Sequence, residues 1–404
     1  MRYDFTTIMD RRGEDAIAVD ALGTGPGVPG APDEGFDAIP MWVADMNFPV
    51  LPDIQEAIIG RVRKPHFGYF EPRAEYFQRI IDWQHDRNGV EGLEPKHIGY
   101  ENGVLGGLIS TLSAFMAPGD AVLVHSPTYI GFTGSINNAG FKIVHSPLKL
   151  DERGVWRMDF ADMERKLAEN KIHAAVFCSP HNPCGRVWER AEIEQAMELY
   201  AKYDCVVVSD EIWSDIILPG HVHVPTQSVS ADARRRTVAL YAPSKTFNLA
   251  GLVGSYHIIY DDYLRDRVTA QSSKPHYNEM NVLSMYALIG AYGAAGRVWV
   301  DELREVLGQN VEWACAHIAE RYAGAGVRTV KPQGTYMLFL DCTGWCEEHG
   351  CEVDELLRRG WHVGVAWQDG RPFLGEHHIR VNLALPTTRV QEAFERLDRY
   401  VFGG

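Results

Sequence analysis

Several polar side chains stand directly after short apolar runs, where a buried strand would end. Lys245 follows the run 238–241, and the acidic pair Asp210 and Glu211 follows the run 205–209. A lysine amine can attack a carbonyl group or carry a proton, and a nearby carboxylate can stabilise positive charge. Taken alone, Lys245 would be interpreted as a solvated surface residue. The acidic pair is poorly explained by packing, so together these residue types predict an active site.

Two further features add to this set. Asn182 lies in a proline-flanked turn after another apolar run, and Gly103, Gly106 and Gly107 open an apolar segment of helical character. Glycines at a helix start let backbone N–H groups approach an anion, which the helix dipole also favours. The alternative for these glycines is close packing of the helix against a neighbour. These residues alone leave both interpretations open, an anion such as phosphate or close packing.

The elements that must position these residues alternate along the chain from about residue 95. Short, nearly continuous apolar runs with β-branched residues are typical of strands covered on both faces, as in a parallel sheet. Helical patterns such as 189–202 lie between them. The predicted fold is therefore α/β with a mostly parallel sheet, and functional residues are expected in the loops that follow the strands. The expected strands are 121–125, 174–178, 205–209, 238–241 and 255–260.

The pattern changes after about residue 295. A long helical pattern at 298–322 leads to two strands, 335–341 and 378–384, and to a final helix. The chain of 404 residues is also too long for one simple core. The expected organisation is an N-terminal segment over 1–45 that packs on the small domain, a large domain over 46–295, and a smaller α+β domain over 296–404.

Three segments carry a resemblance to a known family. They are PHNPCGRVW at 180–188, VVSDEIW at 207–213 and APSKTFNLAGL at 242–252. In order and spacing they resemble the fold-type I enzymes related to aspartate aminotransferase (class I/II), which use pyridoxal 5′-phosphate (PLP). The resemblance implies a three-layer α/β/α fold, a PLP cofactor and an amino-acid substrate.

A narrower resemblance rests on three other segments. MWVADMNFP at 41–49, HFGYF at 66–70 and HIRVNLALP at 378–386 are similar to the C–S lyase branch, the MalY/PatB-type cystathionine β-lyases. This resemblance implies cleavage of a cysteine S-conjugate into a thiol, pyruvate and ammonia. The same site leaves open transamination, and also decarboxylation or oxidative deamination by a diverged member. A requirement for a keto acid would separate transamination from elimination.

The resemblance also implies roles for individual residues. Lys245 would form a Schiff base with PLP and later move the substrate's α-proton, which makes it the catalytic residue. Arg380 would hold the substrate carboxylate through its two-pronged guanidinium. Tyr69 would reach the phosphate or the substrate from the neighbouring subunit, which implies a homodimer with shared active sites. The expected cofactor-binding residues are Gly103, Val104, Leu105, Tyr129, Asn182, Asp210, Trp213, Ser244, Lys245 and Tyr69.

The sequence departs from the family pattern at three positions. Trp213 stands where many relatives have a Tyr or His near the phenolic oxygen of the cofactor, and its indole can donate a hydrogen bond but cannot ionise. Ala242 replaces a phosphate-binding Ser, and Val253 replaces a basic phosphate ligand of many aminotransferases. The phosphate would therefore depend more on the helix start, and the reaction outcome is open.

Composition excludes several other classes of protein. The net charge of −15 disfavours binding to nucleic acid or to an acidic membrane surface. No signal peptide and no spanning segment is expected, so the sequence predicts a cytoplasmic enzyme. The seven cysteines suit a reducing compartment. Cys342, Cys346, His349 and Cys351 lie close together, but their spacing matches no zinc pattern, and we expect no metal.

Overall fold

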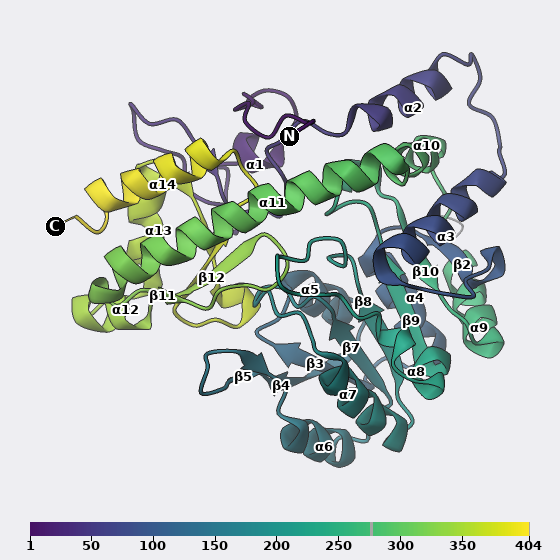
Figure 1. The fold of residues 1–404 in the computed structure, drawn as a ribbon. Coiled ribbons are helices and arrows are strands. Elements are labelled where there is room, and N and C mark those ends of the chain that lie inside the picture. Colours follow the sequence, from purple (N-terminus) through teal and green to yellow (C-terminus); the bar gives the residue numbers. More distant parts are fainter. Residues whose placement is uncertain (275–277, 404) are drawn as a thin grey trace. The chain divides into compact units, whose positions relative to one another are not determined.

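The computed structural model describes residues 1–274 and 278–403, and Figure 1 labels its elements. The chain divides into two compact units. Helix α11 (Ala294–His317) contributes to both, because the boundary between the units falls after Asp301. Among the described residues, no helix has the length and apolar character needed to cross a membrane. Unit 1 comprises Met1–Pro49, Asn182–Gly185 and Glu302–Gly404, and unit 2 comprises Val50–His181 and Arg186–Asp301.

Unit 2 is built around a seven-stranded sheet with the order β2-β10-β9-β8-β7-β3-β4. Five neighbouring strands, from β4 to β9, are parallel, and β10 is antiparallel to both of its neighbours. The parallel strands other than β4 consist largely of buried apolar residues, as expected for strands covered on both faces. The strands are β2 (Ile98–Glu101), β3 (Ala121–Ser126), β4 (Lys142–Pro147), β7 (Ala174–Cys178), β8 (Val206–Asp210), β9 (Thr237–Tyr241) and β10 (Ser255–Ile258); a hairpin of β5 (Lys149–Leu150) and β6 (Trp156–Arg157) lies outside this sheet.

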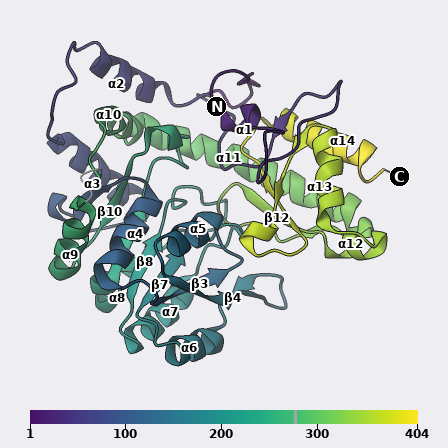
Figure 2. The ribbon, with the colours of Figure 1, turned by 180° about the vertical axis from the view of Figure 1, so that it is seen from behind.

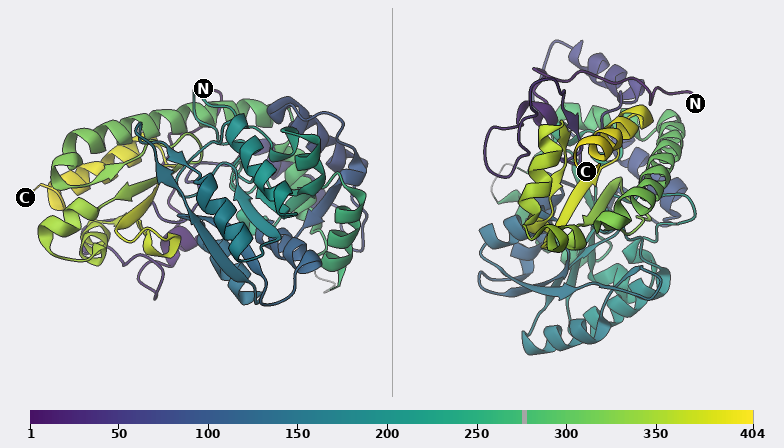
Figure 3. Two further views of the ribbon diagram at one scale, coloured as in Figure 1. Left: turned by 90° about the horizontal axis from the view of Figure 1, so that it is seen from below. Right: turned by 90° about the vertical axis from the view of Figure 1, so that its left-hand side faces the viewer.

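Helices complete the outer layers of unit 2. Helix α4 packs on the sheet together with α5 and α9, while α6, α7 and α8 form a second layer in which α7 contacts both of the others (Figures 2 and 3). Helix α10 contacts α2 and α3. The helices of unit 2 are α2 (Pro52–Val62), α3 (Ala74–Asn88), α4 (Val104–Phe115), α5 (Ile130–Asn138), α6 (Phe160–Glu169), α7 (Arg190–Lys202), α8 (Ala231–Arg236), α9 (Asp262–Ser273) and α10 (Val282–Ala291).

Unit 1 is smaller and contains an antiparallel sheet of four strands in the order β11-β12-β15-β14. The N-terminal segment joins this unit, because β1 pairs in parallel with β13. Helix α13 contacts β13, β14 and β15. The elements are α1 (Ile17–Asp20), β1 (Ile39–Pro40), β11 (Arg328–Thr329), β12 (Met337–Asp341), α12 (Thr343–His349), α13 (Val353–His362), β13 (Val365–Ala366), β14 (Gln368–Asp369), β15 (His378–Asn382) and α14 (Thr387–Tyr400).

The predicted fold class is confirmed, with corrections at several element ends. The strand expected at 205–209 runs one residue later, because the N–H of Cys205 still bonds to the helical carbonyl of Tyr200. The strand expected from residue 335 begins at Met337, since Thr335 has a φ of +67°. The strands expected at 255–260 and 378–384 end earlier, as β10 and β15. Strands β2 and β4 were not predicted, and both lie at edges of the sheet.

Candidate active site

The parallel strands β8 and β9 bring two of the predicted residues together in unit 2. Asp210 is the last residue of β8 and lies opposite Leu240 of β9. Lys245 follows β9 after a short turn and is half-buried. Its charge interacts with the buried Asp210 carboxylate. An amine and a carboxylate therefore share the carboxyl end of this sheet, where α/β folds place their ligands.

The electrostatics of Asp210 indicate a carboxylate without a full complement of partners. Burial raises the pKa of Asp210 to about 7. The backbone N–H of Ile212, at 3.0 Å from Oδ1, and the charge of Lys245 oppose this rise but do not outweigh it. A ligand that brings an N–H group or a positive charge to Asp210 would favour its ionised form.

Trp213 lies beside the amine of Lys245. The side chain of Trp213 is buried, and the Lys245 Nζ atom stands 5.9 Å from the centre of its ring. A cation at this distance is attracted to the face of the indole. Trp213 therefore forms an apolar wall next to the lysine and offers no ionisable group there.

The start of helix α4 fits an anion. Gly103 has a φ of +81°, a conformation that glycine adopts at little cost, and a carbon added to it would meet no described atom within 4 Å. The first hydrogen bond inside the helix runs from the Gly107 N–H to the Gly103 carbonyl. The N–H groups of Val104 and Leu105 belong to the first turn, which has no helical acceptors for them. These groups could hold a phosphate.

Tyr129 lies against this helix start. Its ring lies so close to Gly131 that a side-chain carbon there would lie 2.3 Å from it, and Leu105 also contacts this point. The absence of a side chain at Gly131 therefore makes room for the ring of Tyr129. Ser244, the residue before Lys245, is half-buried in its turn.

Unit 1 brings together Arg380 and Asn182. Arg380 lies on β15 and is 3% exposed. Its Nη1 donates to Asn182 Oδ1 at 3.2 Å, and its Nη2 donates to the Trp42 carbonyl at 3.0 Å and to Gln368 Oε1 at 2.5 Å. The guanidinium also stacks on Phe373, 4.3 Å from the ring centre. These uncharged neighbours orient a buried arginine that could bind a carboxylate.

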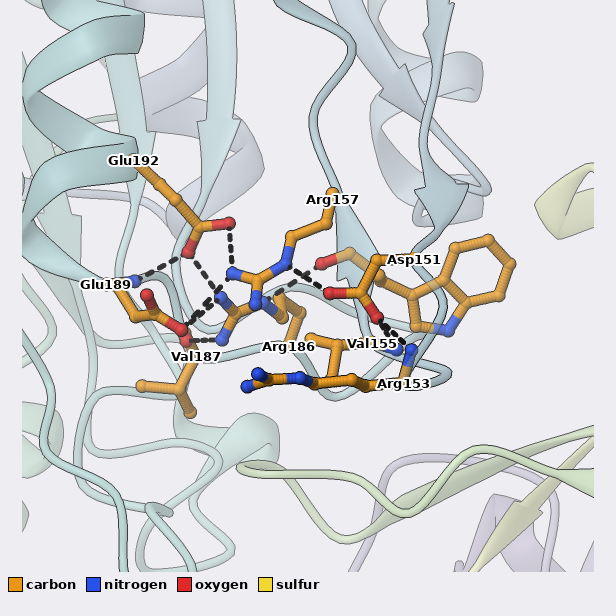
Figure 4. Close-up of polar contacts among 9 residues, drawn as sticks. Asp151, Arg153, Val155, Arg157, Arg186, Val187, Glu189 and Glu192 are labelled. Atoms are coloured by element: carbon orange, nitrogen blue, oxygen red, sulfur yellow. Dashed lines mark hydrogen bonds and ion pairs between the residues drawn. The ribbon is translucent and has the colours of Figure 1, made fainter.

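An ion-pair network holds Arg186, the residue that follows the segment carrying Asn182. His181 and Arg186 flank this segment and form a β-bridge. Figure 4 shows the side chain of Arg186 together with Arg157, held by the carboxylates of Glu189 and Glu192. Arg186 Nε also donates to the Trp156 carbonyl at 3.0 Å. Because Arg186 is 2% exposed, this network holds its guanidinium inside unit 2.

Tyr69 and the substituted positions complete the predicted set. Tyr69 is fully exposed in the single chain, so its predicted role at a partner's site stays a prediction. Ala242 is buried, whereas Val253 is exposed with a φ of +47°. The sequence interpretation missed Asp215, which is buried and bonds to Thr246, the neighbour of Lys245. In residues 1–274 and 278–403, no cluster of His, Cys, Asp or Glu suited to a metal ion is found.

Comparison with known proteins defines the class. Residues 43–397 match the family described as aminotransferase class I and II, and the chain belongs to this family. It is 33% identical over 364 residues to cystathionine beta-lyase PatB of Bacillus subtilis, covering 89% of this chain and 92% of that one. The predicted resemblance to the C–S lyase branch is thereby confirmed.

Two solved structures share the whole fold. The PLP-bound C-S lyase from Staphylococcus hominis is 26% identical, with a TM-score of 0.88 and coverage of 98% of both chains. A PLP-bound putative aminotransferase from Clostridium difficile is 28% identical, with the same TM-score and coverage. The fold is therefore that of PLP-binding enzymes over nearly the full length of the chain.

Proposed function

We propose that this protein is a PLP-dependent C–S β-lyase that cleaves a cysteine S-conjugate into a thiol, pyruvate and ammonia. The likeness to cystathionine beta-lyase PatB over 89% of the chain carries the proposal. The pair of Lys245 and Asp210 at adjacent strand ends supplies the groups that such chemistry needs. Elimination requires removal of the α-proton and departure of a thiolate from the β-carbon.

The residues of unit 2 fit PLP by the chemistry of their donor set. Lys245 offers an amine, Asp210 a buried carboxylate that needs a cationic partner, and the α4 start a cluster of N–H groups. PLP, when bound, supplies a carbonyl that links to the amine and a ring that takes up the electron pair of the substrate's Cα–H bond. Asp210 would pair with the ring nitrogen, and Gly103, Val104 and Leu105 would hold the phosphate.

Other residues would bind and orient the substrate. Arg380 would hold the α-carboxylate, and the Lys245 amine would accept the α-proton. Asn182 would hydrogen-bond the phenolic oxygen of the cofactor, while Tyr129 would cover the face of its ring. Trp213 and Ser244 would complete the cofactor contacts.

The assembly and the setting of the enzyme belong to the same proposal. A homodimer would bring Tyr69 of one subunit to the site of the other, and the full exposure of Tyr69 in the single chain is compatible with this. The proposal also includes domain limits at about residues 45 and 295, an amino-acid substrate and a cytoplasmic location.

Transamination is the second candidate, because a putative aminotransferase shares the fold over 98% of the chain. The same Lys245 would then return the proton to the cofactor side, and a keto acid would accept the amine. Both reactions begin with removal of the α-proton, so the residues described above serve either one.

The deciding experiment uses the PLP-loaded protein. It is incubated with L-cystathionine and with aryl S-cysteine conjugates, first without a keto acid and then with one. Pyruvate and thiol in equal amounts, formed without a keto acid, are the expected result. Loss of the cofactor's absorbance to the pyridoxamine form, with product only when a keto acid is added, would establish transamination and overturn the lyase proposal.

A further inference from the structure

Asp215 is a buried carboxylate that the reaction scheme does not use. It lies five residues after Asp210 and is 5% exposed. The hydroxyl of Thr246 donates to Asp215 Oδ2 at 2.9 Å, and the indole N–H of Trp83 reaches both carboxylate oxygens at 3.1 and 3.2 Å. Burial raises the pKa of Asp215, and Arg87, whose Nε lies 3.9 Å away, opposes this rise. A carboxylate in such surroundings is stable only when its donors stay in place.

These contacts connect three separate parts of unit 2. Asp215 belongs to the turn that follows β8, and that turn starts from Asp210. Thr246 belongs to the turn that follows β9 and is the residue after Lys245. Trp83 comes from α3 and stacks on Tyr292 with ring centres 4.5 Å apart. One carboxylate therefore ties the turn of Asp210 to the turn of Lys245 and fastens both to a helix.

We propose that Asp215 is a positioning residue which, through the hydroxyl of Thr246, fixes the turn of Lys245 relative to Asp210. The inference rests on the proposed function, in which Lys245 binds PLP and moves the α-proton. A lysine has four rotatable side-chain bonds, so the placement of its backbone sets where the amine can reach. Small misplacements of a reacting group cost on the order of 10²-fold in rate.

The test compares the loss of a buried threonine hydroxyl at two positions, Thr246 and Thr226. Thr246→Val removes the hydroxyl that donates a hydrogen bond to Asp215, and Thr246→Ser keeps it. The matched control is Thr226→Val, because Thr226 is equally buried and its hydroxyl bonds instead to Ser209, 2.9 Å away. Each variant is examined for the rate of PLP capture by Lys245, followed by borohydride fixation and peptide mass, and for kcat and KM with an S-cysteine conjugate.

Thr246→Val is expected to slow PLP capture and to lower kcat by about tenfold or more, with KM changed by less than about threefold. Thr246→Ser restores both, and Thr226→Val changes stability but leaves capture and kcat within about twofold. Equal behaviour of Thr246→Val and Thr226→Val would overturn the inference, as would a Thr246→Ser variant as impaired as Thr246→Val. If Thr246→Val does not fold, Asp215→Asn takes its place, with the same readouts and expected direction.

Failure of the proposed function shows up differently. If the wild-type protein captures no PLP on Lys245, the cofactor site itself is wrong. If it captures PLP but releases no thiol, the reaction is wrong, while the capture rates of the Thr246 variants still decide the role of Asp215.

Discussion

Asp210 and Glu211 are neighbours in the sequence and both are buried, yet their surroundings differ. The Glu211 carboxylate accepts hydrogen bonds from His223 Nε2 at 2.8 Å, from the Tyr241 hydroxyl at 2.6 Å and from the Thr226 N–H at 3.1 Å. Burial alone would raise the pKa of Glu211, but these donors outweigh it and the pKa is lowered. Donor groups of the protein itself therefore compensate the charge of Glu211.

Asp210 has the opposite balance. Burial dominates over the N–H of Ile212 and the charge of Lys245, and its pKa rises to about 7. A buried charge without full compensation costs free energy, and groups with strongly shifted pKa values cluster at functional sites. The comparison separates a carboxylate whose charge the protein compensates from one whose charge it compensates only in part. The cofactor-binding role predicted for Asp210 stays a prediction, and its incompletely compensated charge is compatible with that role.

The largest effect is expected at Lys245, on the ligand side of this comparison. Lys245→Ala should lower turnover by on the order of 10³–10⁴-fold, because the group that moves the α-proton is lost. PLP should still bind, but borohydride should no longer fix it to the protein. Absorbance, borohydride fixation and pyruvate release measure these changes. Lys142→Ala, at an exposed lysine, is the control. PLP that remained fixable in Lys245→Ala would place the cofactor lysine elsewhere.

Asp210→Asn tests the uncompensated charge in the PLP-free protein. The folded pKa of about 7 lies above the ordinary 3.8. Asp210 therefore lowers the free energy of unfolding more and more as the pH rises from about 4 to 7. The variant should therefore gain stability relative to the wild type over this range, by about 4 kcal/mol at most. Urea unfolding at several pH values measures the difference.

The same variant should bind PLP more weakly, since the partner of the ring nitrogen is lost. Addition of PLP should reduce the pH-dependent difference in the wild type, because the cofactor supplies the partner that Asp210 lacks. A difference in stability that stays constant from pH 4 to 7 would contradict the raised pKa of Asp210.

Glu211→Gln tests the other member of the pair. The change removes the charge that His223 and Tyr241 compensate, and it should cost about 3 kcal/mol of unfolding free energy at pH 7. Because the folded pKa of Glu211 is lowered, the cost is fully present above about pH 4.5 and shrinks as the pH falls through the folded value. Urea unfolding at pH 7 and pH 4 checks this. A loss of PLP capture without a loss of stability would assign Glu211 to the active site instead.

The sequence predicted what local patterns encode. Nearly continuous apolar runs located the strands that end at Asp210 and before Lys245, within one residue at β8. Strands β2 (IGYE) and β4 (KIVHSP) were missed, because edge strands mix polar and apolar residues and lack such runs. The fold class followed from the alternation of the elements and from the family motifs.

Long-range contacts were beyond the reach of these patterns. Asp215 gains its meaning from Trp83, which is 132 residues away in the sequence, and Arg380 meets Asn182 across 198 residues. The different surroundings of Asp210 and Glu211 also depend on a distant residue, Tyr241. A single sequence shows the residue types at such positions but not their partners. Only the structure shows which buried charges other groups of the protein compensate.

The smallest effect is expected in the network of Figure 4. As at Glu211, the charges of this network are compensated by other groups of the protein. Arg157 pairs with Asp151, Glu189 and Glu192, but 32% of its side chain is exposed. Arg157→Met should therefore cost less than about 1 kcal/mol of unfolding free energy, as exposed ion pairs do. PLP affinity and kcat should stay at wild-type values, because the buried Arg186 keeps its own ion pairs with Glu189 and Glu192. Arg165→Met, at an exposed ion pair, provides the reference for urea unfolding and PLP titration. A clear loss of PLP affinity in Arg157→Met alone would show that the network acts on the cofactor site. A set of charges that the protein compensates would then also affect cofactor binding, which the comparison of Glu211 with Asp210 does not predict.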